Sequence, residues 1–325
     1  MSSILALFNS AIAFGTVIMF GALGETLIEK SGNLNLGIPG VMFLGAIGGL
    51  IPAFFYENAG GTNAFVGIAL SLLCSLAFAA LGGLIYAFLT ITLRANQNVT
   101  GLTLTTFGAG TAEFFGSMLN KLAGGVGQIS IPVTSKGFRA YTALGTKGGV
   151  FELLFAHGFL VYLALVIAVL MHYFLNHTRH GLNLRAVGES PATADAAGIN
   201  VTKYKYIGII IGAAIAGLGG LFYTVDYIKG TWANDGTVEG LGWLAVSLVI
   251  FSTWKPLNII WGSYLFGIIM WSYMYVPGLT RTTSELYKAL PYIFTLFVLI
   301  IVSLRKKKED QPPASLGLSY FREER

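Results

Sequence analysis

Charged residues are scarce in this chain. Asp, Glu, Lys and Arg make up 11% of its 325 residues, whereas hydrophobic residues make up 54%. The mean hydropathy is +0.70. This composition excludes an ordinary soluble domain, of which about one quarter is charged. The single cysteine, Cys74, excludes an intrachain disulfide, and we expect it to pack within an apolar segment.

Motifs for enzymatic chemistry are also absent from the sequence. There is no GxxxxGK[ST] phosphate-binding loop, so we do not expect the chain to hydrolyse ATP itself. There is no GxSxG or HExxH motif either. His177 and His180 have no Cys, Asp or Glu at ligand spacing, so we predict solvated histidines and no metal site. A membrane-embedded enzyme is therefore the least favoured function.

Long runs without Asp, Glu, Lys or Arg are what the sequence has in abundance. They cover residues 1–24, 31–56, 58–93, 95–112, 153–178, 206–225, 240–254, 256–280 and 289–304. Most supply the roughly 20 apolar residues that a helix needs to cross a lipid bilayer. The sequence predicts an all-α polytopic membrane protein with about eight to ten transmembrane helices in one domain, residues 1–304. No positively charged segment of the kind found in a signal peptide precedes the first run. We therefore expect this run to be a transmembrane helix that stays in the protein.

The C-terminal end of the sequence indicates the orientation. Arg305-Lys306-Lys307-Lys308 directly follows the last apolar run, which predicts a cytoplasmic C-terminus. Counting spans back from this point places residues 176–205 in the cytoplasm and residues 120–149 outside. The tail, 305–325, contains two consecutive prolines and many charges, so we expect it to be disordered. We assign the net charge of +5 to orientation and predict no nucleic-acid partner.

Residues 176–205 form the longest charged interruption between apolar runs. Within it, Ser190 is a suitable N-cap and Pro191 a suitable first residue of a helix. Gly198 can adopt the left-handed conformation that ends a helix. The residues between them are too small to bury much surface by themselves. The pattern predicts a short helix, carried on a loop, that another protein grips.

Two stretches, residues 31–46 and 95–110, place polar side chains beside predicted spans. Their amide side chains include Asn33, Asn35, Gln97 and Asn98. In one interpretation, the glycines and proline of 31–46 make a broken or re-entrant segment that lines a transport path, because polar groups at membrane depth need partners in protein or water. A polar surface loop before an ordinary span, with hydrogen bonds between helices, explains the pattern equally well.

The chain resembles the permease subunits of bacterial nucleoside ABC importers, within the larger group of ribose and branched-chain amino acid permeases. Four segments carry the resemblance: GALGETLIEKSGNLNLGIPGVMFLGA (21–46), NQNVTGLTL (96–104), GLNLRAVGESPATADAAGINVTKYKY (181–206) and GLGWLAVSLVIFSTWKP (240–256). The similarity extends over most of residues 15–304, and the segment 181–206 is the most specific. Pro39 is a departure, because relatives usually carry Glu there in an NLGxEG pattern.

The resemblance implies a pore made by two permease subunits, identical or different, each docked to an ABC ATPase subunit. ATP and Mg²⁺ would bind to the ATPase, and this chain would hold no cofactor. The helix at 190–198 would be a cytoplasmic coupling helix, seated in a groove of the ATPase. The residues implied in this contact are Arg185, Gly188, Glu189, Ser190, Ala194, Asp195 and Gly198.

The resemblance also implies nucleoside uptake across a bacterial cytoplasmic membrane, with an extracellular substrate-binding lipoprotein as a further partner. The basic residues expected to dock this lipoprotein are Lys121, Lys136, Arg139 and Lys147. The expected substrate path includes Asn33, Asn35, Gln97, Asn98 and Trp243. The alternative is an ion-coupled secondary transporter of a small polar metabolite. The scarcity of ionisable groups in the deep spans, with Glu113 the main exception, counts against that alternative.

Overall fold

The computed structural model describes residues 2–124, 129–140, 150–232, 236–275, 280–305, 307 and 310–321. These residues form helices and no β-strand, apart from one isolated bridge between Ser130 and Thr231. Seven helices are long and apolar enough to cross a membrane: α1 (Ser2–Lys30), α2 (Ile38–Asn58), α3 (Ala64–Ala87), α7 (Phe159–His177), α10 (Val201–Phe222), α12 (Pro256–Ser272) and α13 (Arg281–Arg305). The chain is an all-α polytopic membrane protein, as the sequence predicts.

Two further helices run along the bundle. α4 (Gln97–Leu122) is 26 residues long but rich in polar residues, and α11 (Thr237–Phe251) has only 15 residues. With them, nine helices of the described residues lie along the bundle, within the expected range. Four short helices lie at its ends: α5 (Pro132–Phe138), α6 (Val150–Phe155), α8 (Arg179–Glu189) and α9 (Pro191–Ala196).

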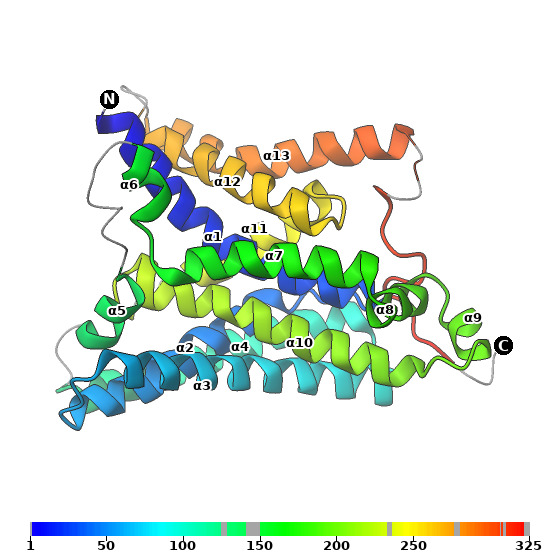
Figure 1. Cartoon of the computed structure of the whole chain (residues 1–325), viewed down its shortest axis with the longest axis horizontal. Helices are drawn as coiled ribbons and strands as arrows, with labels where there is room; N and C mark the ends of the chain where they lie inside the picture. Colours follow the sequence, from blue (N-terminus) through cyan, green and yellow to red (C-terminus); the bar gives the residue numbers. More distant parts are fainter. Residues whose placement is uncertain are drawn as a thin grey trace.

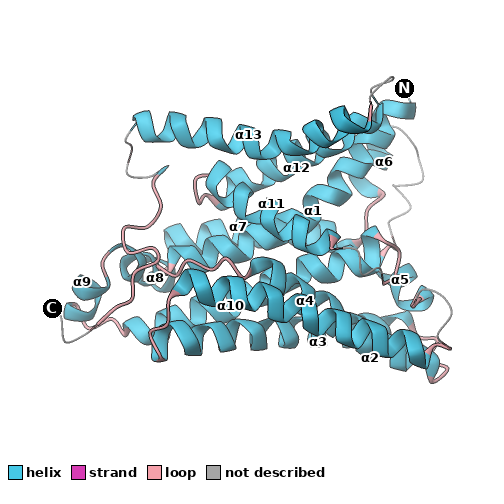
Figure 2. Ribbon diagram, turned by 180° about the vertical axis from the view of Figure 1, so that it is seen from behind, coloured by secondary structure: helices cyan, strands magenta, loops and turns pink. Residues whose placement is uncertain are grey.

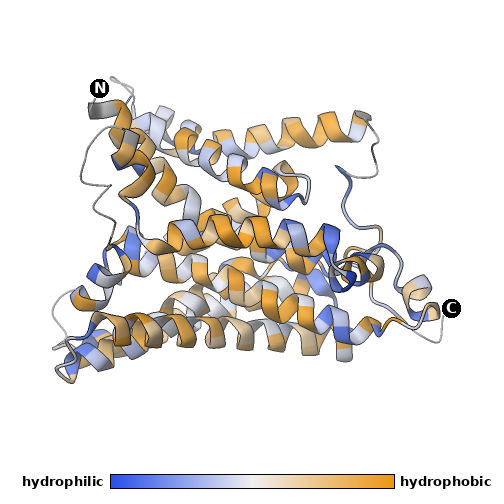
Figure 3. Cartoon of the chain, viewed as in Figure 1, coloured by the Kyte–Doolittle hydropathy of each residue, from blue (hydrophilic) through white to orange (hydrophobic). Residues whose placement is uncertain are grey.

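The long helices alternate in direction, so the two ends of the bundle have different contents (Figure 1). The N-terminus, α5 and α6 lie at one end, whereas α8, α9 and the C-terminal residues lie at the other, and the view from behind agrees (Figure 2). Hydrophilic residues gather at both ends, and the flanks of the outer helices are largely hydrophobic (Figure 3). We call the end that carries α8 and α9 the α8–α9 end.

The centre of the bundle is built from α1, α2 and α10, and α3 packs against α2 and α10 from one side. Within the most apolar 18 residues of each span, 83% of the residues are buried in α2 and 72% in α10. Only 11% are buried in α13, so α13 lies at the periphery. Glycines let these backbones touch. A Cβ atom on Gly45 would lie 2.2 Å from the carbonyl oxygen of Gly217, and one on Gly24 would lie 2.3 Å from that of Gly212. Close helix packing through small residues is typical of membrane proteins.

The break expected within residues 31–46 is confined to a loop, residues 31–37. α2 then runs unbroken for 21 residues, so the segment is not re-entrant. Pro39 lies in the first turn of α2, where its missing N–H costs nothing. The loop is nevertheless not a surface loop, because Asn33 and Asn35 are 1% and 0% exposed.

The contact between α4 and α2 predicts opposite effects for two neighbouring glycines. A Cβ atom on Gly108 would lie 2.2 Å from the carbonyl oxygen of Gly40, whereas one on Gly110 would meet nothing within 4 Å. We expect Gly108→Ala to destabilise the protein by about 1–3 kcal/mol, because the backbones must separate. Gly110→Ala should be neutral or stabilising by up to about 1 kcal/mol, because alanine favours a helix.

Thermal unfolding of the two purified variants in the same detergent tests this expectation. A lower melting temperature for Gly108→Ala alone would support the described α2–α4 contact. Equal melting temperatures for the two variants would contradict it.

Candidate functional site

Two short helices, α8 and α9, cross the end of the bundle between α7 and α10 (Figure 1). The Ser190 hydroxyl accepts a hydrogen bond from the backbone N–H of Thr193 at 3.4 Å and caps α9. Gly198 has a φ of +82°, the left-handed conformation expected just after the helix. The predicted helix at 190–198 is therefore confirmed in type and position.

Helix α8 was not predicted from the sequence. Its N-cap is Thr178, whose hydroxyl accepts from the N–H of Gly181 at 3.0 Å. Leu184 and Val187 form the apolar part of its buried face. These two residues, three apart, were the available signal, but the surrounding polar residues favoured a loop.

The residues expected to contact the ATPase differ in exposure. Gly188 is buried, and a Cβ atom on it would lie 2.3 Å from the carbonyl oxygen of Lys30. Ala194 is 3% exposed and packs in a small cluster with Val187 and Val201. These two residues therefore face their own chain. The half-buried and exposed members of the set are Ser190, Asp195, Arg185, Glu189 and Gly198.

The outward side of α9 carries small residues. Its exposed positions are Ala192, Thr193 and Ala196. With side chains this small, another protein can approach the helix closely. The buried side, centred on Ala194, fixes α9 against α8 and α10.

The C-terminal residues 310–321 lie against α8 and α9 (Figure 1). The backbone N–H and the hydroxyl of Ser315 both donate to the carbonyl oxygen of Gly188, at 3.1 Å and 2.5 Å. The Tyr320 hydroxyl donates to Asp195 Oδ2 at 2.8 Å. Our expectation of a disordered tail therefore does not describe these residues. Bonds between residues more than 120 positions apart are not visible in local composition.

The loop of residues 31–37 is held by side chains from three helices. Gln97 Oε1, on α4, accepts from the N–H of Leu34 at 2.7 Å. Tyr86, on α3, donates its hydroxyl proton to the carbonyl oxygen of Leu34 at 2.6 Å. Glu25, on α1, accepts from the N–H of Asn35 at 3.3 Å. Buried backbone groups need such partners, so the loop has a defined conformation.

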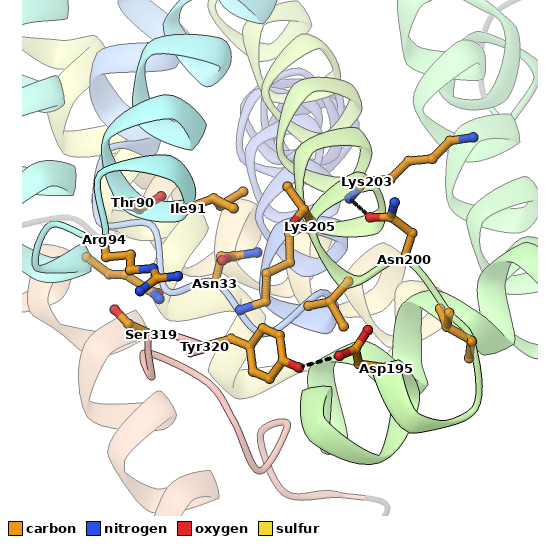
Figure 4. A pocket seen from close by; sticks show the side chains of 15 residues that line it. Asn33, Thr90, Ile91, Arg94, Asp195, Asn200, Lys203, Lys205, Ser319 and Tyr320 are labelled. Carbon is orange, nitrogen blue, oxygen red and sulfur yellow. Dashed lines mark hydrogen bonds between the residues drawn. The ribbon is translucent and has the colours of Figure 1, made fainter. Parts of the chain in front are cut away.

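A cavity of about 710 Å³ lies beside this loop, among the ends of α3, α4 and α10 and the C-terminal tail. Figure 4 shows the side chains of Asn33, Arg94, Lys205 and Tyr320 around it. Polar residues on its wall include Asn33, Arg94, Gln97, Asp195, Lys205 and Tyr320. The cavity therefore contains two of the residues expected along the substrate path, at the α8–α9 end of the bundle.

The remaining predicted path residues are not gathered there. Asn35 is buried in the loop and does not line the cavity; its Oδ1 accepts from the N–H of Gly37 at 2.9 Å. Asn98 is exposed in the first turn of α4, and Trp243 is half-buried in α11. The structure thus brings the amides of the 31–37 loop and Gln97 together, and leaves Asn98 and Trp243 apart from them.

The residues expected to dock an external lipoprotein lie at the opposite end from α9, as far as they are described. Lys121 is in the last turn of α4. Lys136 is exposed on α5, which lies at the end of the bundle away from α9 (Figure 1). Arg139 is half-buried, and its Nε donates to the Ser135 hydroxyl at 3.2 Å. Lys147 lies outside the described residues.

One face of α4 is exposed along its whole length, and only Glu113 on it was notable in the sequence, as a charge within a span. Its polar exposed residues include Thr103, Thr106, Glu113 and Ser117. Phe107 and Phe114 on the same face are 51% and 65% exposed, and they border a hollow of about 370 Å³. The opposite face, with Gly101 and Gly108, is buried against the loop 31–37 and α2. The spacing of three and four residues in the sequence was the available signal.

The chain was compared with known proteins. It is 35% identical over 270 residues to the putative glucose ABC transporter permease protein TsgC13 of Haloferax volcanii. This alignment covers 83% of this chain and 77% of that protein. It is 30% identical to the nucleoside ABC transporter permease protein NupC of Lactococcus lactis, over 96% of this chain and 95% of that protein. It is 29% identical to the guanosine ABC transporter permease protein NupQ of Bacillus subtilis, over 97% of this chain and 96% of that protein.

No solved structure matches the chain. Residues 7–303 match the family described as branched-chain amino acid transport system / permease component, which covers all nine helices along the bundle except the first residues of α1 and the last of α13. Together with the near full-length relatives, this match shows that the chain belongs to that family of membrane permeases.

Proposed function

We propose that this chain is the permease subunit of an ATP-driven ABC importer for nucleosides. Two relatives whose names specify nucleosides or guanosine align over 96% and 97% of the chain, which supports this substrate class. ATP and Mg²⁺ bind to a separate ATPase subunit, and an extracellular protein delivers the nucleoside. This chain provides the path through the membrane.

The exposed face of α4 carries the proposal. A carboxylate near the centre of a bilayer costs about 2.5–3.5 kcal/mol. Glu113 on this face is therefore unsuited to lipid. The face instead meets a second permease subunit, identical or different, around a water-filled path. The residues of this path are Thr103, Thr106, Phe107, Glu113 and Phe114.

The chemistry of this face suits a nucleoside. The phenyl rings of Phe107 and Phe114 can stack on a base, because aromatic rings attract one another in offset or edge-to-face arrangements. The Thr103 hydroxyl donates to the carbonyl oxygen of Val99 at 2.8 Å, and that of Thr106 to Leu102 at 3.3 Å. Their oxygens keep lone pairs that can accept from the ribose hydroxyls or from the base.

Helix α9 is the part that contacts the ATPase in this proposal. It is rigidly attached to α8 and α10, so a push on its exposed side moves α7 and α10 together. The α8–α9 end is then cytoplasmic, which agrees with the basic sequence after α13. The other end, with Lys121 and Lys136, faces the external substrate-binding protein.

A hexose is the second candidate substrate. The relative from Haloferax volcanii, named a putative glucose permease, has a higher identity, 35%, although it covers less of the chain. An aromatic face can also stack on a sugar ring, so the α4 face does not by itself distinguish the two substrates.

Competition in uptake assays distinguishes them. In proteoliposomes containing this chain, its partner permease and the ATPase, with the binding protein outside, we expect ATP-dependent uptake of labelled guanosine. Excess adenosine or uridine should compete and excess glucose should not. An ATPase variant unable to hydrolyse ATP is the control. ATP-dependent uptake of labelled glucose, with no uptake of labelled guanosine, would assign the hexose. Uptake without ATP would contradict an ABC importer.

The α4 path predicts a matched pair of substitutions. Phe107→Ala combined with Phe114→Ala should raise the KM for nucleoside uptake about tenfold, because each ring contributes about 0.5–1.5 kcal/mol to aromatic stacking. Phe65→Ala is the control, since Phe65 is 76% exposed on α3, away from the α4 face. Equal KM values for both variants, at equal amounts in the membrane, would place the path elsewhere.

A further inference from the structure

The cavity at the α8–α9 end holds a buried cation that the transport path does not use. Lys205, in the second turn of α10, is only 3% exposed. Its side chain extends into the cavity toward Asn33 and Tyr320 (Figure 4). No ion pair to Lys205 is present among the described residues. A buried charge without a counter-ion is costly, and a bound anion would offset the cost.

A second buried group at the cavity also lacks a partner. Asn33 is 1% exposed; its Nδ2 donates to the Ser31 hydroxyl at 2.7 Å, but its Oδ1 has no hydrogen bond among the described residues. Side-chain amides of this kind hydrogen-bond to a ligand and fix its orientation. Lys205 and Asn33 therefore both line the cavity, and the Asn33 Oδ1 is buried beside it without a hydrogen bond among the described residues.

The N-terminus of α10 adds positive potential to the wall. Residues 200–203 line the cavity, and the 22-residue helix begins at Val201. Asn200 caps it by accepting from the N–H of Lys203 at 2.9 Å. The partial positive charge of a helix N-terminus favours an anion, phosphate in particular.

Three further charged residues line the cavity among the described residues. The guanidinium of Arg94 enters from the α3 side (Figure 4). It also lies over the ring of Phe321, 4.6 Å from the ring centroid. Asp195, on the wall, accepts a hydrogen bond from the Tyr320 hydroxyl, with 2.8 Å between the hydroxyl oxygen and Asp195 Oδ2. Lys203 is directed away from the cavity (Figure 4). Among the described residues that line the cavity, Lys205 and Arg94 thus place cationic groups at the space and Asp195 places a carboxylate there.

We propose that this cavity binds a soluble phosphate monoester of nucleotide size. The phosphate lies between Lys205, Arg94 and the N-terminus of α10, and the organic part lies against Asn33, Gln97 and Tyr320. A volume of about 710 Å³ suits such a ligand, since small-molecule pockets measure roughly 300–1,000 Å³. Asp195 can accept from a ribose hydroxyl.

The identity of the monoester rests on the proposed function. A nucleoside that enters the cell becomes a nucleoside monophosphate through a kinase reaction, which transfers a phosphoryl group to its 5′-hydroxyl. The cavity wall includes Asp195 of α9 and Tyr320 of the tail. The ligand therefore binds directly against the helix that we assign to ATPase contact, where its level can regulate uptake.

Binding of guanosine 5′-monophosphate to the full chain tests the site. We expect the chain in phosphatidylcholine nanodiscs to bind this probe in calorimetry, and Lys205→Met to weaken binding about tenfold or more, since a charge-assisted bond is lost. Lys203→Met is the matched control and should bind within about twofold of wild type, because its ammonium points away. Lys205→Arg, which keeps the charge, should restore binding. Equal binding by Lys205→Met, or none by wild type, would overturn the proposal.

Two further experiments are needed. One distinguishes a soluble phosphate monoester from a lipid headgroup, and the other distinguishes this inference from the proposed function. Adding phosphatidylglycerol to the nanodiscs should leave guanosine monophosphate binding unchanged at constant ionic strength. Strong competition by this lipid would overturn the soluble ligand and assign the site to a lipid headgroup. Intact guanosine uptake without monophosphate binding would overturn this inference alone. Lys205-dependent binding without nucleoside uptake would overturn the proposed function alone.

Discussion

The structure of the α8–α9 end depends on the need to satisfy the buried backbone of residues 31–37. This loop joins two central helices, and water cannot supply its hydrogen bonds. Side chains from α1, α3 and α4 do so, through Glu25, Tyr86 and Gln97. Gln97 also donates to the carbonyl oxygen of Leu318 at 3.3 Å, so the tail joins the same network. The loop thereby connects three spans to the segment that covers α8 and α9.

This network gives the two short helices a rigid base. Gly188 approaches the end of α1 so closely that no side chain fits between them, and Ser315 closes the other side of the same residue. Ala194 is enclosed by α8 and α10. What remains free is a narrow, small-residue surface on α9. We propose that the ATPase contacts this surface and that its motion moves the spans attached to α8 and α9 together.

Local rules predicted part of this arrangement. The apolar runs predicted the spans, and Ser190, Pro191 and Gly198 predicted α9, because caps depend on neighbouring residues. The burial of Asn33 and Asn35 and the path of the tail could not be predicted in this way. They depend on contacts such as Ser315 with Gly188, 127 residues apart. The exposed face of α4 was visible as a periodicity, but only packing against α2 shows which face is outward.

We propose that α9 contacts the ATPase and that the opposite end of the bundle does not. Photo-crosslinking from single cysteines in a Cys74→Ser chain tests it directly in membranes that contain the ATPase. A photoactivatable group on Thr193→Cys, at the exposed side of α9, should form a covalent adduct with the ATPase. The same group on Lys136→Cys, on α5, should form none. An adduct from Lys136→Cys, with none from Thr193→Cys, would contradict the assignment of the two ends.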